Sequence, residues 1–259
     1  MNIIVCAKQI IDPETPAAAF KIDSDAKRAV PPKDRSMVIS DYDANAMEAA
    51  MKLKDAHGGK VSVLSLGGDS AREVVMHCLA MGGDEGYLLN DPAFNDADSY
   101  ATAYALAEAI KKIGEYDLIL TGRQEGDWDA GQVGSGIAEL LGIPSVTTVG
   151  KIEAGDGKAT VERVVADGRE VLEIGFPALL TISSEVGEPR YATLKGIMGA
   201  KKKPLTYWSS QDVSPAEAKN QILELYIPVH EGKCEFIEAD SPEEAGTSLA
   251  AKLREIKVI

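Results

Sequence analysis

The stretch best suited to chemistry is rich in glycine and lies between an apolar run and a helical pattern, at residues 122–136. It reads Gly-Arg-Gln-Glu-Gly-Asp-Trp-Asp-Ala-Gly-Gln-Val-Gly-Ser-Gly. Glycine lets the backbone approach a ligand closely, and free N–H groups at the start of a helix bind anions. We interpret the stretch either as a cradle for nucleotide phosphate or as an ordinary glycine-rich connection, since it matches neither the G-x-G-x-x-G nor the Walker pattern.

Two further stretches adjoin predicted strand or helix ends. Ser65-Leu66-Gly67-Gly68 ends a strand and either admits a ligand to the backbone or simply turns into the next helix. The stretch from Ser40 to Asp43 precedes the first long helix, where Asp43 as an N-cap explains the sequence without a ligand.

The sequence offers no catalytic constellation. His57, His77 and His230 are scattered, and no Ser-His-Asp, Cys-His or H-x-x-x-H spacing occurs. The three cysteines are too far apart to form a disulfide framework or a metal site. We therefore predict no catalytic residue and no metal ligand.

The elements that would position these stretches alternate between strand and helix over the first 145 residues. Apolar runs predict strands at 3–7, 61–66, 87–89 and 116–121. Helical spacing and glycine stops predict helices at 43–57, 70–81, 98–113 and 131–141. This alternation predicts an α/β fold with a doubly wound, mostly parallel, Rossmann-like sheet. Ligands bind such sheets at the carboxyl ends of strands, here the loops after Ala7, Leu66 and Thr121.

The pattern changes after about residue 145. Short runs at 146–149, 160–165 and 171–174 predict a small antiparallel extension, and 177–183 predicts another buried strand. Regular patterning weakens over residues 186–240, before a last predicted helix at 241–256. A long segment with so little self-packing is typical of an arm around another chain. We therefore divide the chain into a domain of residues 1–185 and an arm of residues 186–259.

Composition narrows the function classes. The chain has 259 residues and a net charge of −14, which argues against a general nucleic-acid binder because phosphate contacts need clustered cations. No run of 18 apolar residues predicts a membrane span, and no secretory signal is visible at the start. Cys6 and Cys78 lie in apolar runs and are predicted core thiols, which favours a reducing cytoplasm.

A short basic run, Lys201-Lys202-Lys203, stands out in this acidic chain. It is interpreted either as solvated charge or as a contact surface for an acidic partner. Tyr207 and Trp208 follow, and they are either interface anchors or part of the arm's own core.

Several linked segments resemble the electron-transfer flavoprotein β subunit family. Residues 161–181 contain Val-Glu-Arg, Asp-Gly-Arg-Glu-Val-Leu and Pro-Ala-Leu-Leu-Thr, which are similar to the family signature, although Ala166 replaces the usual acid. Residues 188–204 resemble the family's partner-recognition loop. The start, Val-Cys-Ala-Lys-Gln, and residues 122–136 also match, so the resemblance covers essentially the whole chain.

The resemblance implies a heterodimer with an α subunit that holds most of one FAD, while the β subunit binds AMP or a second FAD. It implies acyl-CoA-type or other flavin dehydrogenases as electron donors and a quinone-linked oxidoreductase or similar acceptor. Position by position, it implies the following nucleotide-site residues: Cys6, Ser40, Asp41, Tyr42, Asp43, Leu66, Asp127, Trp128, Asp129, Ala130, Gly131, Gln132, Val133, Gly134, Ser135 and Gly136. The implied recognition residues are Arg190, Tyr191, Leu194, Ile197 and Met198, with Leu194 inserting into a dehydrogenase pocket.

Two departures bear on which nucleotide binds. Ser40-Asp41 stands where relatives often have Asn-Pro, and Val133 stands where AMP-binding members often have Thr. Three hypotheses remain: an electron carrier, which we favour; a bifurcating flavoprotein subunit whose own FAD oxidises NADH; and a nucleotide-binding module with no redox role.

Overall fold

The computed structural model describes residues 1–33, 35–228, 232 and 234–259, so His230 lies outside the described residues. Its contacts group into two units, Met1–Glu224 and Leu225–Ile259, which we describe separately. The first unit contains the sheet, and the second contains one helix.

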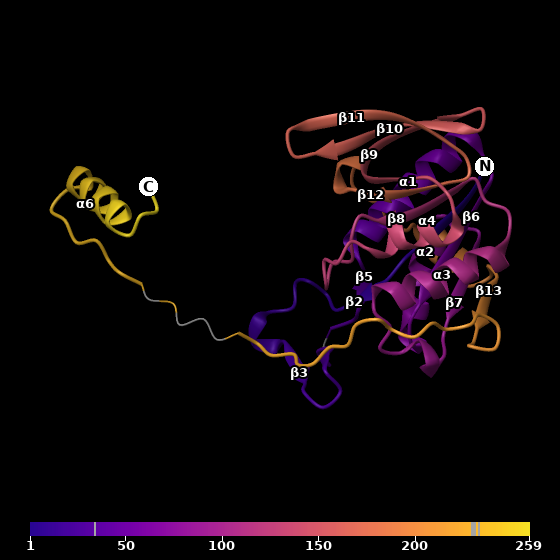
Figure 1. Ribbon diagram of the computed structural model, residues 1–259, viewed down its shortest axis with the longest axis horizontal. Coiled ribbons are helices and arrows are strands. Elements are labelled where there is room, and N and C mark those ends of the chain that lie inside the picture. Colours follow the sequence, from indigo (N-terminus) through magenta and orange to yellow (C-terminus); the bar gives the residue numbers. More distant parts are fainter. Residues whose placement is uncertain (34, 229–231, 233) are drawn as a thin grey trace. The chain divides into compact units, whose positions relative to one another are not determined.

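A nine-stranded sheet is the centre of the first unit (Figure 1), with the strand order β11-β10-β9-β12-β8-β1-β6-β7-β13. Seven of its strands run parallel. They are β1 (Asn2–Cys6), β6 (Lys60–Leu66), β7 (Glu85–Leu89), β8 (Leu118–Gly122), β9 (Ser145–Gly155), β12 (Ala178–Ile182) and β13 (Leu205–Trp208). The antiparallel extension is β10 (Lys158–Val165) and β11 (Gly168–Gly175). The mostly parallel sheet with an antiparallel extension is confirmed.

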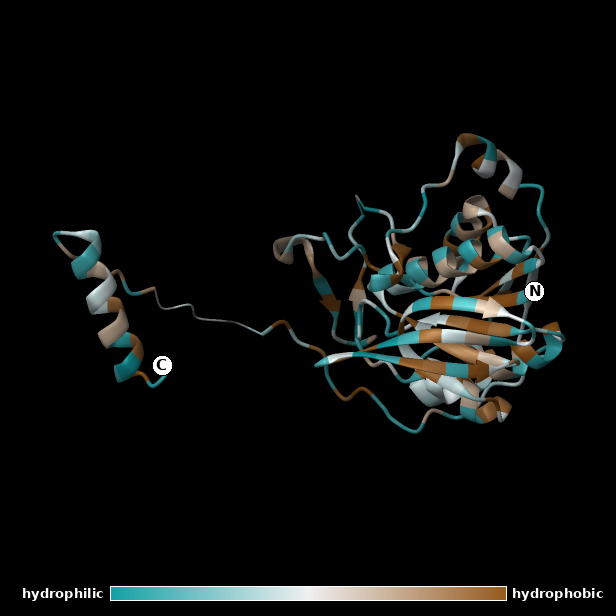
Figure 2. Ribbon diagram, turned by 90° about the horizontal axis from the view of Figure 1, so that it is seen from above, coloured by the Kyte–Doolittle hydropathy of each residue, from teal (hydrophilic) through white to brown (hydrophobic). Residues whose placement is uncertain are grey.

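Helices cover both faces of the sheet, as the doubly wound prediction requires. On one face, α1 (Asp41–His57) and α2 (Arg72–Met81) pack with Ile3 and Val5 of β1 in one core cluster. On the other, α3 (Ser99–Ile113) and α4 (Val133–Leu141) pack with Ile4 and Cys6 of the same strand. Because successive side chains of a strand point to opposite faces, one continuous apolar run contributes side chains to the core on each face of the sheet. Figure 2 shows brown, hydrophobic residues in the strands and a mixture of teal, pale and brown residues along the helices.

The predicted boundaries lie within about two residues of the observed ones for most helices. Asp98 caps α3 as expected, with its carboxylate accepting a hydrogen bond from Ala101 N. The predicted helix at 70–81 begins instead with a 3-10 turn, Asp69–Ala71. Cys6 and Cys78 are buried, as predicted, and Cys234 is exposed.

The long polar excursion after β1 folds into two small ladders. β2 (Gln9–Ile10) pairs with β5 (Val38–Ile39), and β3 (Lys21–Asp23) pairs with β4 (Arg28–Val30). Further 3-10 turns lie at Ala17–Ala19, Pro92–Phe94 and Ser184–Val186. The first ladder returns the chain to the carboxyl end of β1, where α1 begins.

Residues 186–208, predicted as part of an extended arm, contain regular structure. They form α5 (Leu194–Ala200) and β13, which joins the sheet beside β7. Trp208 is buried, with its ring centroid 4.7 Å from that of Tyr87, whereas Tyr207 is half exposed. Trp208 is therefore part of the core of the first unit, and it acts as no interface anchor.

The second unit contains α6 (Pro242–Glu255), close to the predicted last helix. Ser241 caps it, with Oγ accepting a hydrogen bond from Glu244 N at 3.2 Å. None of its residues is buried within the described structure. Across the described residues, no helix combines the length and apolar character needed to cross a membrane.

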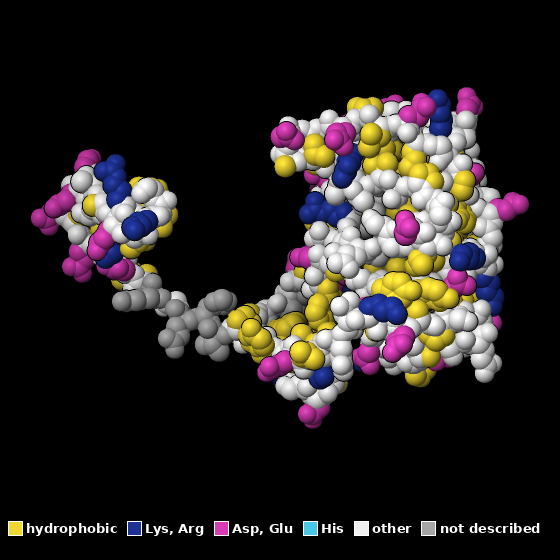
Figure 3. Space-filling view, viewed as in Figure 1, with side chains coloured by type: hydrophobic (Ala, Val, Ile, Leu, Met, Phe, Trp, Pro, Cys, Tyr) yellow, Lys and Arg dark blue, Asp and Glu magenta, His cyan; other side chains and the backbone are white. Residues whose placement is uncertain are grey.

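Charged side chains are mixed on the visible surface. In Figure 3, Lys and Arg side chains stand mostly singly among acidic and uncharged ones. Basic side chains are therefore interspersed with acidic and uncharged ones on that face.

Candidate functional site

The order in which the chain adds strands reverses between β1 and β8, and the loops that follow these two strands meet there. The chain passes from β1 to β6 and β7 on one side and then returns to place β8 on the other. Ligands of open α/β sheets bind at such a switch point, beyond the carboxyl ends of the strands. Lys8, just after β1, bonds both carboxylate oxygens of Asp127 through Nζ, at 2.7 and 2.9 Å. Ser40 Oγ accepts a hydrogen bond from Gly126 N at 3.1 Å.

Asp43 ties the two strand ends together directly. Its Oδ2 accepts a hydrogen bond from Lys8 N at 2.8 Å, and its Oδ1 accepts one from Gly122 N at 2.9 Å. The prediction that Asp43 is the N-cap of α1 is therefore wrong, because α1 begins at Asp41 and its N-cap is Ser40. The carboxylate instead bridges two segments that are far apart in the sequence.

Burial dominates the electrostatics of this bridge. Desolvation raises the pKa of Asp43 to about 7, against the opposing effect of the hydrogen bonds from Lys8 and Gly122. Burial also raises the pKa of Cys6 far above its ordinary value, with the nearby Asp43 charge as a smaller cause. Cys6 is therefore an unreactive, buried side chain near Asp43 rather than a nucleophile.

The acidic side chains of the loop after β8 largely hold the loop itself. Asp129 accepts a hydrogen bond from Gln124 Nε2 at 2.7 Å, and Glu125 accepts one from Gly131 N at 3.3 Å. Asp129 and Gly131 adopt left-handed backbone conformations, with φ of 52° and 62°. The loop is thus shaped by its own carboxylates, and residues 127–132 are exposed.

The start of α4 keeps its capacity to bind an anion. Gln132 precedes the helix, and its side chain makes no capping hydrogen bond. The first N–H groups of a helix have no partner within it and carry partial positive charge. Gly134 brings this helix start close to the sheet: a Cβ there would lie 2.7 Å from Thr121 Oγ1 and 2.8 Å from Thr181 Cγ2.

Arg123 adds a cation that was not among the predicted site residues. Its guanidinium lies 4.6 Å from the centre of the Tyr42 ring. Its Nε is buried without a hydrogen-bond partner among the described residues, and such an orphaned donor needs an explanation. Arg123 therefore adds a cation beside Tyr42, at the start of α1, and the start of α4 separately offers free N–H groups.

The structure brings most of the predicted nucleotide residues to one junction, where the ends of β1 and β8 meet the start of α1 and the loop into α4. Leu66 lies at the end of β6, on the other side of β1. Gln9, which was not among the predicted site residues, links the segment after β6 to the junction. Its Nε2 donates a hydrogen bond to Ser70 O at 2.9 Å, and its Oε1 accepts one from Ser70 Oγ at 2.7 Å. Asp41 and Ser135 are exposed, and so is Trp128, with 54% of its surface accessible. Lys8 and Gln9 follow an apolar strand immediately, and this position was the available signal for them.

A hollow of about 300 Å³ lies at the opposite, amino-terminal ends of β1, β6 and β7. Glu85 lines it and already accepts hydrogen bonds from Ser62 Oγ and Tyr87 Oη, each at 2.8 Å, and pairs with Lys60. This hollow is therefore separate from the junction and offers no free polar group at Glu85.

A second candidate surface is formed by the predicted recognition residues. Tyr191 is 96% exposed and Leu194 75% exposed, and Ile197 and Met198 are also exposed. Large apolar side chains gathered in this way are typical of a protein-binding surface. Arg190, by contrast, is held in ion pairs with Glu48 and Asp55 and is not part of the exposed apolar group.

Known proteins of one family match this chain over most of its length. The family model of the electron transfer flavoprotein domain matches residues 33–213. The caffeyl-CoA reductase-Etf complex subunit CarD of Acetobacterium woodii is 40% identical over the full length of both chains. The electron transfer flavoprotein subunit beta of Thermoanaerobacterium thermosaccharolyticum is 45% identical over 78% of this chain and 76% of that protein. The acryloyl-CoA reductase electron transfer subunit gamma of Anaerotignum propionicum is 38% identical over 79% of this chain and 76% of its own.

Proposed function

The chain belongs to the electron transfer flavoprotein β subunit family, and from this premise we propose that it binds an adenine nucleotide where the loops after β1 and β8 meet. The observation that carries this proposal is the bonded junction at the switch point, in which Asp43, Lys8 and Ser40 fix both loops. A partner α subunit would hold most of one FAD, which supplies the redox chemistry when bound.

Different residues of the junction suit the phosphate and the base of an adenine nucleotide. The uncapped N–H groups at the start of α4 and the Arg123 side chain suit the nucleotide phosphate. Cys6 and Leu66 supply apolar strand ends, and the exposed Trp128 ring offers a face for an aromatic base. Asp127 and Asp129 act on the loop rather than on the phosphate, because both carboxylates already have partners and would repel an anion.

The exposed apolar group on and before α5 is the proposed docking surface for an electron donor. Two relatives carry names that place them in caffeyl-CoA and acryloyl-CoA reductase systems. These names indicate acyl-CoA substrates rather than a direction of electron flow, and we propose acyl-CoA-type or other flavin dehydrogenases as the donor class, with a quinone-linked oxidoreductase or similar protein as the acceptor. The second unit would contact the α subunit, and the complex would act in the cytoplasm, where buried thiols such as Cys6 stay reduced.

Val133 favours one alternative. It occupies the first position of α4, where a Thr hydroxyl would bond a phosphate and a Val side chain does not. The alternative is therefore a second FAD at the junction in place of AMP, with NADH as its hydride donor. Family membership favours both redox hypotheses over a nucleotide-binding module without redox function.

Nucleotide analysis of the purified complex with its α subunit tests these proposals. Denaturation should release one FAD and one AMP per heterodimer for the carrier, or two FAD for the alternative. A complex that releases no adenine nucleotide beyond the FAD of the α subunit would refute the proposed junction site.

Replacement of Leu194 tests the docking surface. Leu194→Ala should raise the KM of the complex for a reduced acyl-CoA dehydrogenase about tenfold, as expected for an interface anchor, while leaving the released nucleotides unchanged. Lys195→Ala, at the next exposed position of α5, serves as the matched control. Equal KM values for Leu194→Ala and the unaltered protein would exclude this surface.

A further inference from the structure

A stripe of polar side chains along α1 holds the segment that leads to α5. Asn45, Glu48, Lys52 and Asp55 are spaced by three, four and three residues, which places them on one side of the helix. Asn45 Nδ2 donates to Gly187 O at 2.9 Å, and Lys52 Nζ donates to Val186 O at 2.7 Å. We call residues 186–190 the strap.

Glu48 makes the strongest of these attachments. It is 4% exposed and accepts three hydrogen bonds from Arg190: one from the backbone N at 3.0 Å, one from Nε at 2.8 Å and one from Nη2 at 3.0 Å. Asp55 pairs with Nη1 of the same arginine at 2.9 Å. Burial alone would raise the pKa of Glu48, but the hydrogen bonds from Arg190 hold it below its ordinary value. This paired, forked contact fixes the strap immediately before the exposed Tyr191.

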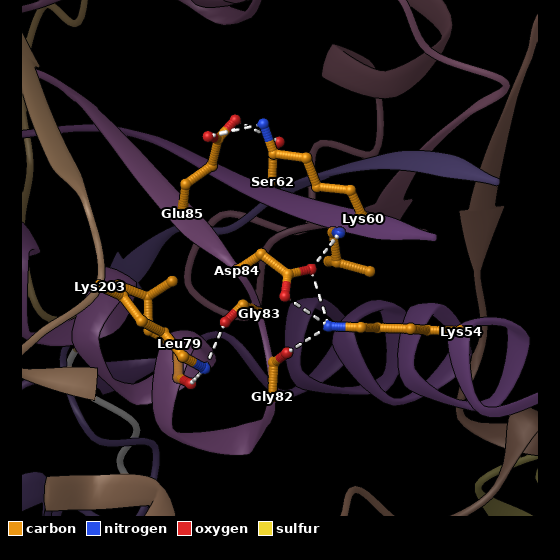
Figure 4. A network of polar contacts seen from close by, with 10 residues as sticks. Lys54, Lys60, Ser62, Leu79, Gly82, Gly83, Asp84, Glu85 and Lys203 are labelled. Carbon is orange, nitrogen blue, oxygen red and sulfur yellow. Dashed lines mark hydrogen bonds and ion pairs between the residues drawn. The ribbon is translucent and has the colours of Figure 1, made fainter. Parts of the chain in front are cut away.

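Lys203 fixes the other end of α5. Its Nζ donates to the carbonyl oxygens of Leu79 and Gly83 at 2.8 and 2.5 Å, where α2 ends (Figure 4). A helix carboxyl terminus carries partial negative charge, so a cation stabilises it. Lys54 caps the same turn through Gly82 O at 3.0 Å and pairs with Asp84 at 2.7 Å.

The basic run at 201–203 therefore divides into two kinds of lysine. Lys201 and Lys202 are exposed, whereas Lys203 is half-buried and bonded to α2. Its pKa is lowered by desolvation. The interpretation of the whole run as a surface for an acidic partner is wrong for Lys203.

The middle of α5 also lies directly on α2. A Cβ at Gly196 would lie 2.3 Å from Ala80 O, so only glycine permits this approach. Ala200 is buried in the same core cluster as α1 and α2. The face of α5 that remains open carries Leu194, Ile197 and Met198.

We propose that Glu48 and Lys203 are positioning residues that hold α5 in its docking conformation before the electron donor arrives. α5 has seven residues, and an isolated helix of that length is unstable in water. Anchors at both ends remove the need to order the segment during docking, and this lowers the entropic cost of association. The inference rests on the proposed function of the exposed apolar group as a docking surface.

The test uses the full chain in complex with its α subunit, with Glu48→Gln and Lys203→Met as the altered forms. Amide hydrogen exchange at residues 191–203 should become about tenfold faster or more, because local opening no longer breaks the anchors. The KM for the probe, a butyryl-CoA dehydrogenase reduced by butyryl-CoA, should rise about fivefold or more with little change in kcat. Flavin and AMP content should stay unchanged, since both anchors lie outside the junction.

Matched controls separate anchoring from charge. Lys202→Met removes a positive charge at an exposed position next to Lys203 and is the control for Lys203→Met. Glu73→Gln removes a negative charge at an exposed position of α2 and is the control for Glu48→Gln. Both should leave exchange and KM unaltered. Lys52→Met provides a second strap variant at an exposed position, in case Glu48→Gln fails to fold.

The outcomes distinguish this inference from the docking proposal beneath it. If Leu194→Ala raises KM but Lys203→Met and the strap variants leave exchange and KM at their original values, positioning is overturned while docking stands. An increase in KM without faster exchange also overturns positioning. If Leu194→Ala itself has no effect on KM, the docking surface fails first.

Discussion

Burial of Asp43 makes the free energy of unfolding depend on pH, and the direction of this dependence follows from the shift in its pKa. Burial raises its pKa from 3.8 to about 7, while Lys8 lowers it and Glu125 raises it slightly. Between these two pH values the folded chain retains a proton that the unfolded chain has lost. Asp43 therefore contributes stability that is present in full below pH 3.8 and is lost as the pH rises through about 7.

The magnitude follows from the slope of this linkage, about 1.4 kcal/mol per pH unit when one proton separates the two states. Asp43→Asn removes the titration but keeps the shape. It leaves one acceptor oxygen for two N–H donors, which costs about 1–3 kcal/mol at every pH. The free energy of unfolding of the unaltered chain minus that of Asp43→Asn should therefore fall by about 2 kcal/mol from pH 5 to pH 7.

Urea unfolding of the full-length chain at pH 5, 6 and 7 measures this difference. Asp41→Asn is the control, because Asp41 is exposed and lies two residues away. Its difference from the unaltered chain should show no comparable slope. A difference for Asp43→Asn that stays constant or grows with pH would show that the buried carboxylate is ionised throughout, and the reasoning from burial would be refuted.

Three further predictions concern the junction and α5. Gly134→Val should destabilise the chain by about 2 kcal/mol and reduce bound nucleotide, since its side chain meets Thr121; urea unfolding and nucleotide release check this. Gly196→Ala should raise KM for the dehydrogenase by lifting α5 from Ala80, whereas Gly199→Ala, with open space around its Cβ, should not. Added AMP should quench the fluorescence of the exposed Trp128 in nucleotide-free protein, and Trp128→Phe should abolish that change while the buried Trp208 still fluoresces.

Much of the fold was predictable because its signals are local. Alternating apolar runs and helical spacing are visible within single elements such as β1, with 5 residues, and α1, with 17 residues. Gly82 and Gly142 mark where α2 and α4 end, and Asp98 and Ser241 mark where α3 and α6 begin. These features depend on neighbouring residues along the chain.

The strands and helices beyond residue 185 were harder to predict for the same reason. β13 has four residues and is stabilised by its place beside β7 rather than by its own pattern. α5 has seven residues, among them two glycines, and is held by Lys203 and Arg190 from outside the helix. Short segments of this kind carry too few residues to show a period.

The sequence by itself determined the alternation of strands and helices, the glycine-rich loop after β8 and the family resemblance. Only the tertiary structure decided what each polar side chain does. Asp43 looked like a helix cap, yet its two partners lie 35 and 79 residues away along the chain. Lys203 looked like free surface charge, yet it bonds the carbonyl oxygen of Gly83, 120 residues earlier, at the turn that follows α2. Hydrogen bonds over such separations depend on which strands become neighbours in the sheet, and no window of local sequence contains that order.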